Sequence, residues 1–162
     1  TEEHEKQRHQ KTNLSSDYTF DTLVEGKGNR IAAAAAQSIA ENPGSYNPFF
    51  LYGSTGLGKT HLVQAVGNEL LKRNPDSKVR YMHSDEYIRS FMNAVRNNLY
   101  DAFKQQYRNF DLFIIYDIQF IKGKDRTMEE FFYLYEHFYN EKKQLILTWD
   151  VLLVNIKAMD ER

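Results

Sequence analysis

Short apolar runs alternate with longer segments of helical periodicity along most of this 162-residue chain. The runs that predict strands are 49–52, 79–82, 112–116 and 144–148, and the segments that predict helices are 31–39, 61–72, 85–108 and 128–140. The run Leu112–Tyr116 is apolar at every position, which is typical of a strand buried on both faces of a sheet. Strands that alternate with helices of this length indicate parallel pairing. The pattern therefore predicts an α/β fold with a parallel sheet and helices on both faces.

The first 16 residues lack this pattern. They carry three acidic and three basic side chains, and Leu14 is their one large apolar residue. A segment of this composition buries too little apolar surface to offset the entropy of ordering it. We therefore interpret residues 1–16 as a flexible polar tail or linker and residues 17–162 as the folded domain.

Composition and charge narrow the classes of function. The chain has 21 Lys and Arg against 22 Asp and Glu, so any site for nucleic acid or an anionic membrane must be local. The absence of cysteine excludes disulfides, thiolate metal sites and thiol nucleophiles. The five histidines show no metal-ligand spacing, and we assign them no chemistry. No apolar run reaches the roughly 18 residues of a membrane helix. We expect a soluble, cytoplasmic protein.

The sequence GSTGLGKT directly follows the first predicted strand and directly precedes a predicted helix. It matches the phosphate-loop pattern G-x-x-x-x-G-K-[ST] in full. Gly53, Gly56 and Gly58 would let backbone N–H groups converge on an anion, and the N-terminus of the helix adds positive potential. Lys59 would contact the β- and γ-phosphates, and Thr60 would ligate Mg²⁺. The motif predicts a site for ATP or ADP with Mg²⁺.

A magnesium–nucleotide complex also requires an acid at the end of a neighbouring strand. Asp117 follows the most apolar run, but Tyr116 stands where a second acid would be expected. If Asp117 holds the metal, the acid that polarises the attacking water is missing; if Asp117 polarises water, Tyr116 has replaced the metal acid. In either case we expect hydrolysis to suffer more than binding. At the end of the last strand, Asp150 is favoured over Thr148 as a sensor of the γ-phosphate, with a solvated turn residue as the alternative.

Basic residues gather in two places. Residues 72–108 carry eight bases against four acids, and Lys122, Lys124 and Arg126 follow the strand that ends at Asp117. These cations could contact the phosphates of a passing single strand. A solvated charged face is the alternative.

Four segments of the chain resemble a known family: YTFDTLVEGKGNRIA, FFLYGSTGLGKTHLVQAVGN, FIIYDIQFIKGKDRTMEEFFYLY and LILTWDVLLVNIKAMDER. Through them, residues 17–162 are similar to the ATP-binding domain of the bacterial DnaA replication initiators, which are AAA+ ATPases. The resemblance implies a three-layer phosphate-loop fold, here a partial AAA+ domain. It also implies a role in origin opening through ATP-dependent oligomerisation and contact with single-stranded DNA.

The resemblance carries roles to individual residues. It implies that the segment from Val24 to Asn29 packs on adenine. It places contacts to single-stranded DNA at Met92, Lys124 and Arg126. For the cluster of Lys122, Lys124 and Arg126, this favours DNA binding over a charged face that is only solvated.

This sequence also departs from the family. The family has two acids before Ile-Gln-Phe, so the resemblance implies that Asp117 is the catalytic acid, that Tyr116 replaces the metal-holding acid, and that Asp150 is the first sensor. The sequence stops at Arg162, before the family's arginine finger, last core strand, helical lid and helix-turn-helix domain. We therefore expect no sequence-specific origin binding. We also expect an open sheet edge at the phosphate-loop strand, and marginal stability unless a second copy or a full-length initiator covers that edge.

Two other functions remain open at this point. One is a hydrolysing ATPase of the helicase-loader or initiator-regulator kind, which requires Tyr116 to be compensated. The other is a hydrolysis-deficient interaction module that docks on an initiator through the open edge and the aromatic segment Phe131–Tyr133. Whether ATP is hydrolysed stays undecided.

Overall fold

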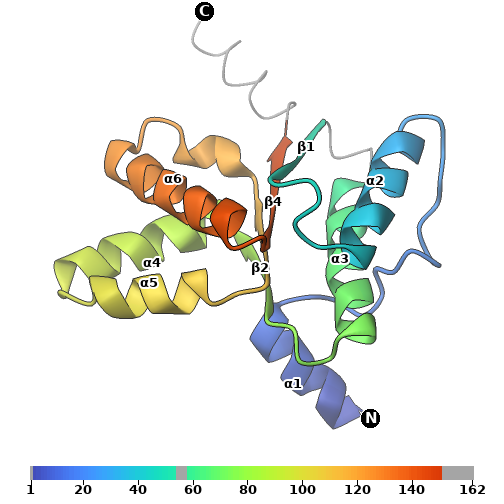
Figure 1. Ribbon diagram of the computed structural model, residues 1–162, viewed down its shortest axis with the longest axis horizontal. Helices are drawn as coiled ribbons and strands as arrows, with labels where there is room; N and C mark the ends of the chain where they lie inside the picture. The colour runs from blue at the N-terminus through green and yellow to red at the C-terminus, as the bar shows by residue number, and fades with distance from the viewer. Residues whose placement is uncertain (1, 54–57, 151–162) are drawn as a thin grey trace, which may run out of the picture.

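The computed structural model describes residues 2–53 and 58–150 of the chain (Figure 1). The four strands are β1 (Phe49–Gly53), β2 (Val79–His83), β3 (Leu112–Tyr116) and β4 (Gln144–Asp150). The helices are α1 (Glu2–Thr12), α2 (Arg30–Glu41), α3 (Lys59–Arg73), α4 (Ser84–Arg96), α5 (Tyr100–Arg108), the 3₁₀-helix η2 (Ile118–Ile121) and α6 (Asp125–Asn140). The four predicted strands and the helices at 31–39, 61–72 and 128–140 agree with these bounds to within three residues at either end.

The four strands form one parallel sheet in the order β1-β4-β3-β2. Within the described residues, β1 and β2 are the edge strands and β4 and β3 lie in the centre. The strand that precedes the phosphate loop is thus at an edge of the described sheet, as expected from the sequence. All four carboxyl ends point the same way, so the residues that end or follow these strands gather along one side of the sheet.

Helices cover both faces of the sheet. Helices α2 and α3 lie on one face, and α4, α5 and α6 lie on the other (Figure 1). In β3, Leu112 and Ile114 pack against the α2–α3 layer, whereas Phe113 and Ile115 pack against the α4–α6 layer. All four side chains are fully buried, and each contributes roughly 1.5–3 kcal/mol relative to an exposed position. The three-layer α/β fold predicted from the sequence is confirmed, and burial on both faces explains the unbroken apolar run.

One predicted helix is two helices. The periodicity of residues 85–108 predicts a single helix, but α4 ends at Arg96 and α5 begins at Tyr100. Asn98 between them adopts a left-handed backbone with φ of 56°. The amide of Leu99 then bonds back to the carbonyl of Ala94 at 2.7 Å. Asparagine tolerates this conformation better than most residues, so the pair Asn97-Asn98 was the overlooked signal for a helix end.

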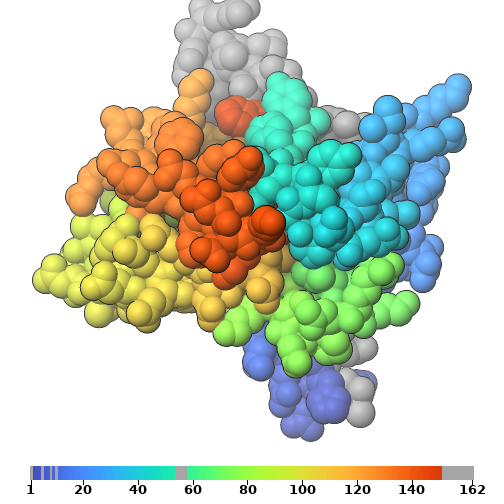
Figure 2. Space-filling model, viewed as in Figure 1, coloured from blue at the N-terminus to red at the C-terminus, as the bar shows by residue number. Residues whose placement is uncertain are grey.

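The N-terminal segment differs from the predicted polar tail. Residues Glu2–Thr12 form α1, which projects from the three layers beside the edge strand β2, on the side away from the carboxyl ends of the strands (Figures 1 and 2). Leu14 is 3% exposed and belongs to the core beside α3. It packs over Gly67, where an added Cβ would lie 2.8 Å from a methyl group of Leu14. Hydrogen bonds from Asn13 to the carbonyl of Tyr81 and from the amide of Ser15 to Gln64 also tie the end of this segment to the domain, which composition alone does not reveal.

None of the helices in the described part of the chain is both long and apolar enough to cross a membrane.

Candidate functional site

The carboxyl ends of the four strands bring together residues that are far apart in the sequence. Gly53 ends β1, His83 ends β2, Asp117 directly follows β3, and Asp150 ends β4. Lys59, at the start of α3, lies among them. We call these five residues the strand-end site. The sequence predicted four of its members, and the fold explains why they meet.

The described residues of the phosphate-loop motif lie at the end of β1 and the start of α3. Gly53 closes β1, and Gly58 stands at the N-terminal cap of α3 with a left-handed backbone of φ 72°. Open space surrounds the position of a Cβ on Gly58, so this backbone conformation, and not crowding, requires glycine there. Thr60 is the second residue of α3 and is exposed. The predicted phosphate contact Gly56 lies outside the described residues.

Lys59 holds its ammonium inside the site. The side chain is 6% exposed, and Nζ donates a hydrogen bond to the carbonyl oxygen of Gly53. Burial lowers the pKa of Lys59, and the carboxylates of Asp150 and Asp117 oppose that shift by favouring the ammonium. A buried cation beside a helix N-terminus is arranged to receive an anion.

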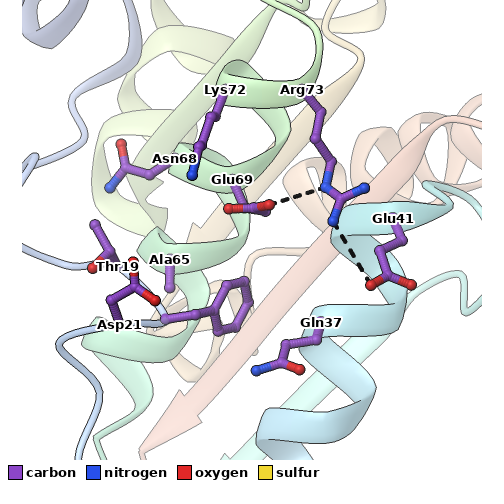
Figure 3. A pocket seen from close by; sticks show the side chains of 10 residues that line it. Thr19, Asp21, Gln37, Glu41, Ala65, Asn68, Glu69, Lys72 and Arg73 are labelled. Atoms are coloured by element: carbon purple, nitrogen blue, oxygen red, sulfur yellow. Dashed lines mark hydrogen bonds and ion pairs between the residues drawn. The ribbon is translucent and has the colours of Figure 1, made fainter.

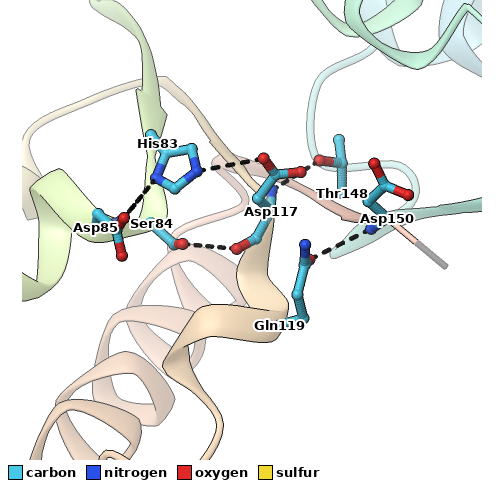
Figure 4. Close-up of polar contacts among 7 residues, drawn as sticks. All are labelled: His83, Ser84, Asp85, Asp117, Gln119, Thr148 and Asp150. Atoms are coloured by element: carbon cyan, nitrogen blue, oxygen red, sulfur yellow. Dashed lines mark hydrogen bonds and ion pairs between the residues drawn. The ribbon is translucent and has the colours of Figure 1, made fainter. Parts of the chain in front are cut away.

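Asp117 is held by contacts from β4 and from the start of α4 (Figure 4). Its backbone is left-handed, with φ of 58°, which is strained for a residue with a Cβ. Its amide donates to Oγ1 of Thr148 on β4 at 3.1 Å, and its carbonyl accepts from Oγ of Ser84 after β2 at 2.6 Å. Thr148 and Ser84 are buried, so both bonds are shielded from water. The predicted catalytic acid thus has a fixed position.

His83, to which the sequence analysis assigned no chemistry, lies beside Asp117. Its Nδ1 accepts from the amide of Asp85 at 3.0 Å, so in the neutral ring the proton resides on Nε2. Nε2 lies 3.2 Å from Oδ2 of Asp117 and donates to it (Figure 4). The signal available in the sequence was the position of His83 at the end of a predicted strand.

Asp150 lies on the phosphate-loop side of the site. It is 5% exposed and pairs across the sheet with Gly53. Its amide donates to Oε1 of Gln119 at 3.3 Å (Figure 4). The Nε2 atom of Gln119 is buried without a hydrogen-bond partner among the described residues, so a donor is left available beside the two acids. Thr148, which the sequence ranked below Asp150, contacts Asp117 instead.

Tyr116, at the place of the second acid, belongs to an aromatic group. Its ring stacks on Tyr81 with centroids 4.5 Å apart and planes 10° apart, and it meets His83 edge-on at 4.8 Å. Burial raises the pKa of Tyr116, and the nearby charges of Asp117 and Glu86 raise it further. The phenol is therefore neutral near pH 7, and Asp117 contributes the single carboxylate at the end of β3.

The residues carried over for adenine form a surface loop. Asn29 holds this loop, because its Oδ1 accepts from the amide of Gly26 at 2.9 Å and its Nδ2 donates to the carbonyl of Val24 at 3.1 Å. Val24 is 84% exposed, which leaves an apolar side chain available for contact. The loop directly precedes α2, and its role in adenine binding stays a prediction.

The three residues predicted to contact DNA line one hollow of about 410 Å³ between α4 and the start of α6. Met92 is 50% exposed on α4, and Lys124 and Arg126 face it from the segment before and within α6. Arg96, on α4, adds a third cation that the sequence analysis counted only as part of a wider patch. The lining residues, which we call the α4–α6 hollow, are Phe91, Met92, Val95, Arg96, Lys124, Asp125, Arg126 and Thr127.

A second hollow of about 320 Å³ lies between α2, α3 and the loop before them (Figure 3). Arg73 there is paired with Glu69 at 3.0 Å and with Glu41 at 3.7 Å. Lys72 and Arg73 end α3, about 20 Å along the helix from Lys59. Because its acids and bases neutralise one another, this hollow does not extend the predicted basic patch.

Comparisons with known proteins give a consistent result. The family model described as the bacterial DnaA ATPase domain matches residues 14–162. The chromosomal replication initiator protein DnaA of Neisseria gonorrhoeae is 81% identical over 159 residues, which are 98% of this chain and 31% of that protein. The chain thus spans about a third of the length of this curated relative.

Two solved structures are similar to the described fold. Domain III of the DnaA protein of Thermotoga maritima matches with a TM-score of 0.81 and 36% identity, over 85% of this chain and 57% of that one. A replication initiator DnaA bound to AMPPCP and single-stranded DNA matches with a TM-score of 0.79 and 40% identity, over 85% and 43%. The helicase-loader alternative is not favoured by these matches. The chain belongs to the bacterial DnaA ATPase domain family.

Proposed function

We propose that this chain is the ATP-binding part of a bacterial replication initiator. It binds ATP or ADP at the strand-end site, associates with further copies when ATP is bound, and contacts single-stranded DNA during origin opening. The observation that carries the proposal is the buried ammonium of Lys59, which lies at the N-terminus of α3 beside the phosphate loop. A related initiator has been solved with AMPPCP and single-stranded DNA. Action on a bacterial chromosome would place the protein in the cytoplasm.

Each residue of the site has a physical task in this proposal. The ammonium of Lys59 leaves the carbonyl of Gly53 and pairs with the phosphate oxygens, which relieves the cost of its burial. The amides at the start of α3 add hydrogen bonds to the same oxygens. Asp117 orients the attacking water through a carboxylate that His83 holds, and Asp150 senses the γ-phosphate.

Mg²⁺ is implied by the family, and the residues present fit a protein-held metal site poorly. Thr60 offers a hydroxyl and Asp117 one carboxylate, whereas Tyr116 offers a neutral phenol that packs against Tyr81. Mg²⁺ prefers charged or strongly polar oxygen ligands in octahedral geometry. If Mg²⁺ accompanied the triphosphate, Thr60 and Asp117 would be the side chains to contact it, and it would offset negative charge on the phosphates.

Contact with single-stranded DNA is proposed at the α4–α6 hollow. Arg96, Lys124 and Arg126 supply cations that attract phosphates, and Met92 supplies an exposed apolar surface for a base or sugar. Association of copies is proposed from the family alone, and it would bring several such hollows along one strand.

The decisive experiment compares two lysines of α3. Isothermal titration of ATP is carried out on the wild type, on Lys59→Ala and on the matched control Lys72→Ala, an exposed lysine at the far end of the same helix. Loss of charge-assisted hydrogen bonds to phosphate costs a few kcal/mol, so we expect the affinity of Lys59→Ala to fall by about 100-fold. Lys72→Ala is expected to bind like the wild type. Equal heats from all three folded proteins would contradict the proposed function.

A second measurement addresses hydrolysis. Because Tyr116 replaces one acid, we expect slow or absent phosphate release, and any release should disappear in Asp117→Asn. Steady turnover that survives this substitution would remove Asp117 from its proposed role.

A further inference from the structure

Three side chains could approach a metal on the nucleotide, and each already has a partner within the protein. The side chain of Thr60 on α3 lies near the hydroxyl of Tyr81, whose pKa it lowers. Asp117 accepts from Nε2 of His83 at 3.2 Å. Tyr116 stacks on the ring of Tyr81 and meets His83 edge-on. The contacts of Tyr81, Tyr116, His83 and Asp117 form one connected group at the ends of β2 and β3.

Tyr81 is the centre of this group. It is 6% exposed, and burial raises its pKa to about 12, against which the hydrogen bonds from Gln64 and Thr60 act. Its hydroxyl is therefore neutral near pH 7 and lies beside Thr60 and Gln64 of α3.

Tyr116 also changes the charge of the site, compared with an acid at the same position. A carboxylate at this position would bring a second negative charge beside Asp117, which a divalent cation would then neutralise. The neutral phenol of Tyr116 brings none, so Asp117 faces no neighbouring acid on its own strand. Within residues 2–53 and 58–150, no group of three or more acidic, histidine or cysteine side chains is arranged to hold a metal ion.

We propose that this chain binds ATP independently of magnesium, because the Tyr81–Tyr116 pair replaces a protein-held metal site with an aromatic contact. The inference rests on the proposed nucleotide binding and deepens it. The positive charge that holds the triphosphate comes from Lys59 and the N-terminus of α3, and the protein gains little from a cation on the phosphates. The chain would then retain nucleotide in a form suited to binding and poorly suited to hydrolysis.

The experiment measures the dissociation constant of ATP with excess Mg²⁺ and with EDTA. It uses the 162-residue chain as wild type, Tyr116→Asp and the matched control Tyr116→Phe. For the wild type we expect the two dissociation constants to agree within about threefold, a difference well below the tenfold that corresponds to 1.4 kcal/mol. Tyr116→Phe keeps the ring that stacks on Tyr81 and should behave like the wild type.

Tyr116→Asp should acquire a requirement for the metal. The new carboxylate repels the triphosphate in EDTA, and Mg²⁺ relieves that repulsion, so the ratio of the two constants should exceed the wild-type ratio by about tenfold or more. A wild-type ratio above about tenfold would overturn the proposal by itself, even if Tyr116→Asp fails to fold. A strong Mg²⁺ requirement that disappears in Tyr116→Phe would also overturn it, because the phenol would then be a ligand.

The same data separate this inference from the proposed function. If ATP binds under neither condition, the nucleotide site itself is refuted. If ATP binds only with Mg²⁺ and binding needs Lys59, the proposed function stands and the metal-independent site is wrong.

Discussion

The strand-end site and the α4–α6 hollow hold their residues in different ways. In the strand-end site, Lys59 and Asp150 are 6% and 5% exposed, and Asp117 has contacts from β4 and from the start of α4. In the α4–α6 hollow, Met92 is 50% exposed and the cations Lys124 and Arg126 are exposed on one surface. The first is a set of buried, mutually dependent contacts, and the second is a group of independent charges in water.

This difference predicts how substitutions combine. Buried polar groups that share a partner depend on one another, because each loss leaves an unsatisfied group in a low dielectric. Exposed cations act on a ligand through screened Coulomb attraction, and their contributions add. Changes at the strand-end site should therefore be large and non-additive, whereas changes at the hollow should be modest and additive.

The largest effect is expected at the two residues that hold Asp117. Thr148→Val removes the acceptor of the Asp117 amide, and Ser84→Ala removes the donor to its carbonyl. Each should lower the free energy of unfolding by about 1–3 kcal/mol, because a buried backbone group loses its partner. Urea unfolding of both single variants and of the double variant measures the effect, with exposed Ser16→Ala as control.

The double variant tests the interdependence directly. We expect the combined loss to differ from the sum of the single losses by at least about 0.5 kcal/mol, as for residues that share one partner. If the two losses of stability simply add, the strand-end site behaves like a set of independent contacts. The proposed difference between this site and the α4–α6 hollow would then be wrong.

A smaller effect is expected at the α4–α6 hollow. Lys124→Ala and Arg126→Ala should each weaken binding of a labelled oligothymidylate and reduce the slope of log affinity against log salt by about 0.7. Both substitutions are at exposed positions, so the free energy of unfolding should stay within about 0.5 kcal/mol of the wild type. Lys72→Ala on α3 is the matched control. Unchanged salt slopes in both variants would remove this hollow from the proposed DNA contact.

The smallest effect concerns the pH dependence of stability. Burial raises the pKa of Tyr81 to about 12, whereas an unfolded tyrosine ionises near pH 10. The unfolded state therefore releases this proton first, so the stability contribution is complete below pH 10 and is lost as the pH rises toward 12. At about pH 10.5, Tyr81→Phe should reduce the loss in the free energy of unfolding by up to about 1 kcal/mol.

This experiment tests whether the surroundings of the strand-end site are buried, because Tyr81 lies next to that site. Urea midpoints at neutral and alkaline pH are compared for the wild type, Tyr81→Phe and the control Tyr139→Phe, a tyrosine that is 60% exposed. If Tyr81→Phe and Tyr139→Phe show the same pH dependence, the ring of Tyr81 is open to solvent and the closed aromatic group is wrong.

Several features were predictable because the signal is local. The phosphate-loop motif placed Gly53 at the end of β1 and Gly58, Lys59 and Thr60 at the start of α3, since a strand, a glycine turn and a helix follow one another along the chain. The apolar run of β3 fixed its burial on both faces for the same reason.

Other features required the fold. The break at Asn98 and the burial of Leu14 were missed, because helical periodicity continues across the first and polar neighbours surround the second. The contact of His83 with Asp117 joins residues 34 positions apart in sequence and depends on β2 lying next to β3.

The sequence by itself determined the alternation of strands and helices, the phosphate loop and the family, because each of these depends on residues that are close together in the sequence. The tertiary structure decided which partner each candidate residue has. Strand order placed Asp117 between His83 and Thr148, and the packing of α3 on β2 placed Thr60 against Tyr81. The physical reason is that charge and hydrogen bonding act over a few ångströms in space, and only the sheet brings these distant residues within that range.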